Sequence, residues 1–131
     1  MQWLKASCVL LSVLIVAAPA PATSAPAGEA KQDTTVAGLP RLVDLGAHKC
    51  IPCKKMAPIL KDLRKEYEGT VEVVFLDVWK DPKSAGPYGI RLIPTQIFFD
   101  RKGREVFRHE GYFSREEILK VFRDKLGVAT R

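Results

Sequence analysis

The chain of 131 residues, with 47% hydrophobic and 27% charged residues, suits one small globular domain with an appendage. The formal net charge of +6 is spread along the chain rather than gathered beside aromatic residues, so it does not indicate nucleic-acid binding. There are only three cysteines, and two of them lie so close together that the chain is not a scaffold held by disulfides.

The beginning of the chain has the order of regions found in a secretory signal peptide. Lys5 gives a positive start, Val9–Ala18 is a short apolar run, and small residues and prolines follow. The run is shorter than the ~20 residues of a membrane-spanning helix, but an uncleaved anchor is the alternative. Cys8 precedes the run and is expected to leave with the signal. We expect an exported protein, periplasmic or extracytoplasmic, with a signal peptide at 1–27, a flexible lead-in at 28–39 and one domain at 40–131.

The rest of the chain predicts a β-α-β unit, a link and a β-β-α unit. The expected elements are a strand at 41–47, a helix at 50–68, a strand at 71–79, a turn-rich link at 81–89, strands at 95–100 and 105–109, and a helix from Ser114 to Gly127. Ser114 and Glu117 predict a capping box, and Gly127 predicts the helix end. The first unit predicts a right-handed parallel crossover and the hairpin adds antiparallel strands, so we expect an α/β fold with a mixed sheet flanked by helices. Trp79 and Phe107 are interpreted as core or flanking residues.

The sequence Cys50-Ile51-Pro52-Cys53 follows an apolar strand and begins an amphipathic helix. A cysteine at a helix N-terminus meets unpaired backbone N–H groups and the positive end of the helix dipole, which favour the thiolate over the thiol. Lys49 and Lys54 add positive charge nearby. Two thiols at this spacing can close into a disulfide and reopen. Cys50 is therefore the predicted nucleophile, and Cys53 is predicted to attack the mixed disulfide that Cys50 forms with a partner.

A metal-binding pair is the alternative interpretation of these cysteines. A closed zinc site needs two further ligands, and only His48 and His109 are on offer, the latter far away on the hairpin. We predict no metal, with a copper-delivery module using Cys50, Cys53 and His48 as the alternative, since thiolates suit Cu(I). His48 itself has two interpretations: as an imidazolium it stabilises the Cys50 thiolate, or it is merely an exposed loop residue.

The pattern from about Leu42 to the last helix resembles the thioredoxin superfamily. Asp44 stands six residues before the first cysteine, as the buried aspartate does in thioredoxins, and the cysteine pair occupies the active-site position. The segment Tyr88–Thr95, which contains Ile93-Pro94, resembles the one that carries the family's cis-proline. The resemblance implies a thioredoxin-like fold, in which residues 28–39 look too short for the full first strand and helix.

The resemblance also implies roles for these residues. Asp44, an acid in an apolar strand, would lie behind Cys53 and accept its proton, and Pro94 would be cis, with the backbone of Ile93 offered to an extended substrate segment. The sequence departs from the family's pattern where Lys49 replaces a tryptophan, Gly46 replaces an aromatic residue, and Phe75 replaces the lysine that usually neighbours the aspartate. With Phe75 there, the pKa of Asp44 should be raised further by burial.

The combined expectation is an exported, monomeric thiol–disulfide oxidoreductase that needs no bound cofactor and acts on disulfide-containing client proteins. Oxidase relatives typically carry a large helical insertion before the cis-proline, and the short link at 81–93 has no room for one. We therefore favour the reducing direction, with electrons supplied by a membrane thiol-relay protein. A disulfide donor, working in the oxidase or isomerase direction, is the alternative.

Overall fold

The computed structural model describes residues 38–130. Its elements are β1 (Arg41–Gly46), α1 (Ile51–Glu66), β2 (Glu72–Asp77), the 3-10 helix η1 (Pro82–Tyr88), β3 (Thr95–Phe99), β4 (Glu105–Glu110) and α2 (Arg115–Leu126). The expected signal peptide at 1–27, the lead-in up to residue 37 and Cys8 lie outside the described residues. Over residues 38–130, none of the helices has the length and apolar character needed to cross a bilayer.

The four strands form one mixed sheet in the order β2-β1-β3-β4. The β1–β2 pair is parallel, as the β-α-β unit predicts, and the other two pairs are antiparallel. Asp44 in β1 lies directly opposite Phe75 in β2 and Gln96 in β3, so these three side chains share one face of the sheet. The predicted α/β class and the mixed sheet are both confirmed.

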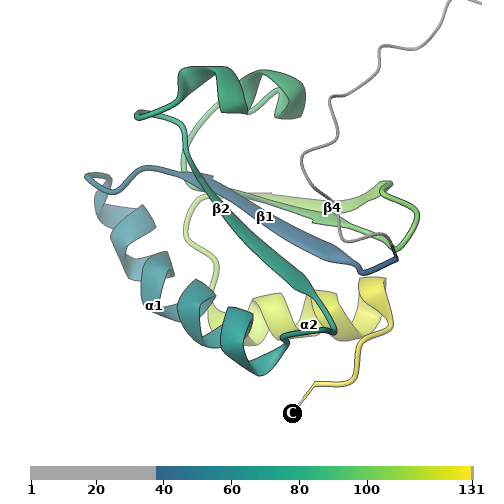
Figure 1. The fold of residues 1–131 in the computed structure, drawn as a ribbon. Coiled ribbons are helices and arrows are strands. Elements are labelled where there is room, and N and C mark those ends of the chain that lie inside the picture. The colour runs from purple at the N-terminus through teal and green to yellow at the C-terminus, as the bar shows by residue number, and fades with distance from the viewer. Residues whose placement is uncertain (1–37, 131) are drawn as a thin grey trace, which may run out of the picture.

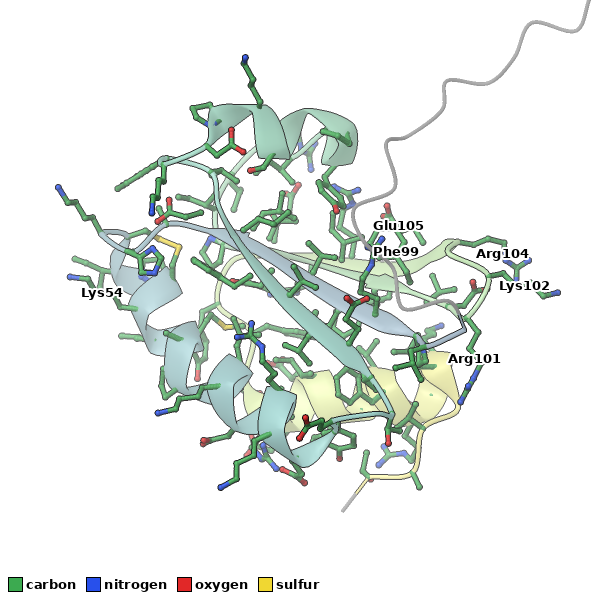
Figure 2. All side chains as sticks on the ribbon, in the orientation of Figure 1. Lys54, Phe99, Arg101, Lys102, Arg104 and Glu105 are labelled. Carbon is green, nitrogen blue, oxygen red and sulfur yellow. A yellow bond between two sulfur atoms is a disulfide. The ribbon has the colours of Figure 1, made fainter. Side chains whose placement is uncertain are left out.

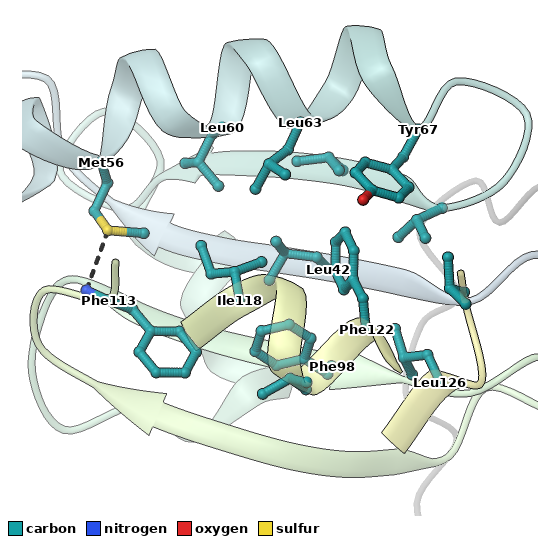
Figure 3. Close-up of a cluster of buried hydrophobic side chains, with 14 residues drawn as sticks. Leu42, Met56, Leu60, Leu63, Tyr67, Phe98, Phe113, Ile118, Phe122 and Leu126 are labelled. Atoms are coloured by element: carbon teal, nitrogen blue, oxygen red, sulfur yellow. Dashed lines mark hydrogen bonds between the residues drawn. The ribbon is translucent and has the colours of Figure 1, made fainter. Parts of the chain in front are cut away.

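Helices α1 and α2 cover the same face of the sheet, as Figure 1 shows. Their apolar sides meet the sheet in one core, shown in Figure 3, to which α1 contributes Met56 and Leu63 and α2 contributes Ile118 and Phe122. Fully burying side chains of this kind stabilises the fold by about 1.5–3 kcal/mol each. Met56 also accepts a hydrogen bond at Sδ from the backbone N–H of Phe113, at 3.3 Å, which ties the start of α1 to the segment before α2.

The opposite face of the sheet is covered by η1, which lies on the other side from the two long helices in Figure 1. Val43, Leu45 and Ile97 form the buried layer there, and Tyr88 packs against it. The link between β2 and β3 thus holds one short helix. Because both faces are covered, the two central strands β1 and β3 are almost completely buried.

The ends of α2 follow the local rules that the sequence predicts. Ser114 and Glu117 form a complete capping box, and Gly127 ends the helix in the left-handed conformation, with φ of 64°. Phe107 packs against the core, as expected. Trp79 does not: β2 ends at Asp77, two residues earlier than the predicted strand, and Trp79 is 60% exposed.

Candidate active site

The cysteine pair lies where β1 ends and α1 begins. The backbone N–H of Cys50 donates to the carbonyl of Ala47 at 3.1 Å, which closes the turn after the strand. Cys50 is the N-cap of α1, and its Sγ accepts a hydrogen bond from the backbone N–H of Cys53 at 3.3 Å. The two cysteines form a disulfide, with their Cα atoms 5.2 Å apart. The same capping geometry would stabilise a Cys50 thiolate when the disulfide is reduced, because the N–H groups of the first helical turn favour negative charge.

The charges around the pair are positive. Helix α1 has no acidic residue in its first turn. Lys49 and Lys54 are exposed beside the cysteines, and neither forms an ion pair with another described residue. Their charges are therefore not neutralised locally. Figure 2 shows Lys54 at the N-terminal end of α1, close to the disulfide.

The two sulfur atoms differ in their surroundings. Cys50 is 8% exposed and Cys53 is 3% exposed, so both are largely covered in the disulfide form and Cys50 is the outer of the two. Cys53 borders a cavity of about 250 Å³, which Ala47, Phe75 and Lys54 also line. Cys53 thus lies at the wall of this cavity, although little of its own surface is exposed.

Asp44 is fully buried, and its pKa is raised from 3.8 to about 6 by that burial. It shares its face of β1 with Gly46, which lies against Cys53. A hydrogen bond from Gln96 Nε2 to Asp44 Oδ1, at 2.7 Å, acts in the opposite direction on the pKa but is the smaller effect. On the other side, Phe75 of β2 lies opposite Asp44, where the resemblance placed a lysine in related proteins. The expected raised pKa of Asp44 is therefore confirmed, and an acid with this pKa can take up or release a proton near neutral pH.

The surroundings of Gly46 explain why a glycine stands here in place of the family's usual aromatic residue. A Cβ atom at Gly46 would lie 3.0 Å from Cε2 of the Phe75 ring and 3.2 Å from Cys53 Sγ. The Phe75 ring thus occupies the space beside the strand, and the backbone of Gly46 packs directly against the inner cysteine. The two departures at positions 46 and 75 are linked, because the glycine makes room for the phenylalanine.

His48 has a partner that the sequence did not predict. Its ring Nδ1 pairs with a carboxylate oxygen of Asp77, and its backbone N–H donates to the same oxygen at 3.2 Å. This contact, with backbone N–H groups of Trp79 and Lys80, lowers the pKa of Asp77 to about 2. The His48 ring also meets the Phe75 ring edge-on, with centroids 5.2 Å apart. In the structure His48 therefore contacts Asp77. The effect of His48 on the Cys50 thiolate stays a prediction.

The loop before β3 approaches the cysteines from the other side. The Ile93-Pro94 peptide bond is cis, as the resemblance implied, and Ile93 packs against Ala47, Cys50 and Cys53. Pro94 is buried, and its carbonyl accepts a hydrogen bond from the backbone N–H of Gly111 at 2.7 Å. The end of β4 thus fixes this loop beside the disulfide.

The structure gives the metal alternative no further ligands. Among residues 38–130, no three side chains of His, Cys, Asp or Glu are grouped so that they could hold a metal ion. His109 lies on β4, where its ring stacks on Phe113 with centroids 4.1 Å apart.

The site residue that sequence reasoning missed is Gln96. The available signal was a polar residue within the otherwise apolar strand 95–99, the same signal that singled out Asp44.

An α/β fold with a mixed sheet, in which a reversible cysteine pair caps a helix beside a cis-proline, defines a thiol–disulfide oxidoreductase. The chain belongs to the thioredoxin family, whose model, described as Thioredoxin, matches residues 28–124.

Two relatives give the extent of the similarity. A thioredoxin from Synechocystis sp. is 44% identical over 69 residues, which cover 53% of this chain and 64% of the relative. A thioredoxin from Staphylococcus aureus is 37% identical over 93 residues, which cover 71% of this chain and 88% of the relative. The similarity to thioredoxins therefore agrees with the enzyme class that the site defines.

Proposed function

We propose that this protein is an exported reductase of disulfides in client proteins, supplied with electrons by a membrane thiol-relay protein. The observation that carries the chemistry is the capping geometry of Cys50, whose Sγ accepts the backbone N–H of Cys53 in a helix turn free of acidic residues. That geometry supports a thiolate at Cys50 in the reduced protein.

The reaction consists of two exchanges. The Cys50 thiolate attacks one sulfur of a client disulfide, so a Cys50–client bond forms and the other client sulfur leaves as a thiolate. Cys53 then passes its proton to Asp44 and attacks Cys50 Sγ, which releases the second client thiolate. The client gains two electrons, and the protein is left with the Cys50–Cys53 disulfide. The relay protein restores the dithiol by the same exchange in reverse.

The surface around the pair supports a polypeptide client. All the large exposed apolar side chains of residues 38–130 lie at this end of the sheet: Ile51 at the start of α1, and Trp79, Leu92 and Tyr112 on the loops. Ile93 lies among them, and in the described part of the chain its backbone N–H and C=O make no internal hydrogen bond. An extended client segment can pair with these backbone groups while its apolar side chains contact the surrounding loops.

Two observations support the direction and the compartment. The connection between β2 and β3 holds only η1, so the described domain has no helical insertion before the cis-proline. The export proposal rests on the sequence of residues 1–27, with its positive start, short apolar run and small residues. An exported reductase needs a source of electrons from inside the cell, which is why a membrane relay is the proposed donor.

Replacing Cys53 with Ala tests the whole proposal, because the variant should accumulate mixed disulfides on Cys50. Captured clients and a membrane thiol protein, recovered from the exported fraction, would support it. Capture of cytosolic proteins alone would contradict the compartment. A strongly reducing potential, measured against glutathione, would support the reductase direction, and an oxidising one would reverse it. A double variant with Cys50→Ser controls for non-covalent capture.

A further inference from the structure

Gln96 is a polar side chain at a place where the fold offers no obvious reason for one. It lies in the central strand β3 and is fully buried. Its register position is directly opposite Asp44, and the two residues, 52 positions apart in the sequence, are joined by the 2.7 Å hydrogen bond from Gln96 Nε2 to Asp44 Oδ1. On the other side of Asp44, the facing residue of β2 is the apolar Phe75. Of the two residues that face Asp44 across the sheet, only Gln96 is therefore a polar partner.

Each member of this pair has one side-chain oxygen that is buried and has no hydrogen bond. These atoms are Asp44 Oδ2 and Gln96 Oε1. A buried acceptor without a donor is costly and uncommon, so two in one pair need an explanation. A proton taken up at Asp44 Oδ2 supplies one, because Oδ2 then becomes a donor and Gln96 Oε1 an acceptor.

The amide is suited to a carboxyl group that changes its protonation state. Its N–H₂ donates to a carboxylate, and its C=O accepts from a carboxylic acid. A lysine ammonium at the same place could only donate, and an apolar side chain could do neither. Gln96 therefore matches both states of Asp44.

We propose that Gln96 is a positioning residue for proton transfer between Cys53 and Asp44: it holds the carboxyl group by Oδ1 and leaves Oδ2 to exchange the proton. This inference rests on the proposed role of Asp44 as proton acceptor. In the step, the Cys53 S–H bond breaks and an O–H bond forms at Asp44 Oδ2. The electron pair left on sulfur attacks Cys50 Sγ, so the Cys50–Cys53 bond forms, the Cys50–client bond breaks and the client sulfur leaves as a thiolate. The proton is then held by a hydrogen bond to Gln96 Oε1.

The surroundings of Asp44 contain few other ionisable groups. Strand β2 presents Phe75 and β3 presents Gln96 directly opposite Asp44. Cys53 of α1, which is a thiol only after reduction, lies against Gly46, two residues further along β1 on the same face. On β4, His109 lies opposite Gln96 in the same row across the sheet. At the end of β2, the Asp77 carboxylate contacts the His48 ring and also accepts the backbone N–H of His48.

The main test replaces Gln96 with Met, which keeps the length of the side chain and removes the amide. A hydrogen bond to a charged group is worth more than one to a neutral group, so the loss should favour the acid over the carboxylate. The titration midpoint of Asp44, followed by carbon NMR in the reduced protein, should rise by about one pH unit, a tenfold change in the ionised fraction. The rate of the second thionitrobenzoate release from dithionitrobenzoate, which reports attack by Cys53, should show the same rise in its midpoint.

The double variant Asp44→Asn/Gln96→Met decides whether Gln96 acts through Asp44. We expect Asp44→Asn to abolish this midpoint, and Gln96→Met to change nothing further in that background. The matched variant His109→Gln should leave the midpoint in place. If Gln96→Met does not fold, Gln96→Glu serves instead, because two facing carboxyl groups share a proton and should split the titration into two steps.

The failures of the two proposals are distinguishable. If Asp44→Asn leaves the pH profile of the second release unchanged, the proposed role of Asp44 is wrong. If Asp44→Asn abolishes the midpoint but Gln96→Met leaves it at the wild-type position, only the inference about Gln96 is overturned. An equal loss of rate at every pH, in both backgrounds, would assign Gln96 a purely structural role and would also overturn it.

Discussion

The two ends of the sheet treat their charges differently. At the hairpin end, labelled on the right of Figure 2, the carboxylate of Asp100 accepts the backbone N–H groups of Lys102 and Arg104, at 2.9 and 3.0 Å, and pairs with the Arg104 guanidinium at 2.6 Å. At the disulfide end, Lys49 and Lys54 have no ion-pair partner among the described residues.

The apolar side chains show the same difference. Every large exposed apolar side chain of residues 38–130 lies at the disulfide end. At the hairpin end, Asp100 finds all its partners within four residues of itself. The disulfide end keeps exposed apolar side chains, and apolar patches are typical of surfaces that contact another molecule. The difference indicates which end the reaction uses.

The largest expected effect is the loss of activity when Cys50 is replaced with serine, compared with a serine substitution at the hairpin end. Cys50→Ser should reduce disulfide reduction to the background rate, because the hydroxyl cannot form a mixed disulfide, whereas Lys102→Ser should leave the rate unchanged. Turnover of an insulin disulfide assay measures both. Activity that survives in Cys50→Ser would show that the nucleophile has been assigned to the wrong residue.

The carboxylates at the two ends predict opposite pH effects on stability. The pKa of Asp44 lies above its ordinary value of 3.8, at about 6, so the native state binds more protons than the unfolded state between those values. Its contribution is therefore lost as pH rises through this window, by about 3 kcal/mol in total. The free energy of unfolding of the wild type, compared with that of Asp44→Asn in urea, should fall by this order between pH 4 and 7. A constant difference would contradict the raised pKa.

Replacing one glycine at each end of the sheet separates the effect of close packing from the effect of backbone strain. Gly46→Ala places a methyl group against Phe75 and Cys53, which should cost about 1–3 kcal/mol and also slow disulfide exchange. Gly103→Ala meets no atom within 4 Å but has a φ of 75°, so it should cost about 1–2 kcal/mol without changing the exchange rate. Gly86→Ala, with neither problem, is the control. Equal exchange rates in all three variants would rule out the close packing at Gly46.

The smallest expected effect is at Asp100. The backbone N–H of Arg104 and the Arg104 side chain lower the pKa of its carboxyl group, so its stabilising contribution is present above the ordinary pKa and is lost as pH falls. Asp100→Asn should therefore slightly reduce the melting temperature at neutral pH, and the difference from wild type should vanish in acid. Thermal melts across pH measure it. A difference that grows in acid would contradict the assignment, and activity should be unchanged throughout.

Much of the active site was predictable because its residues lie close together in the sequence. The cysteine pair, the N-cap and the neighbouring lysines lie within one loop and one helical turn. Asp44 was recognisable as an acid in an apolar strand. The partnership of His48 with Asp77 was not, because the two residues are 29 positions apart and meet only where β1 and β2 end side by side.

By itself the sequence determined the element types, the caps of α2 and the placement of two thiols at a helix N-terminus, because these depend on residues within about four positions of one another. Only the tertiary structure decided that Phe75 fills the space left by Gly46 and that Gln96 reaches Asp44. Such contacts depend on strand register, which is fixed by burying one face of the whole sheet and not by any local rule.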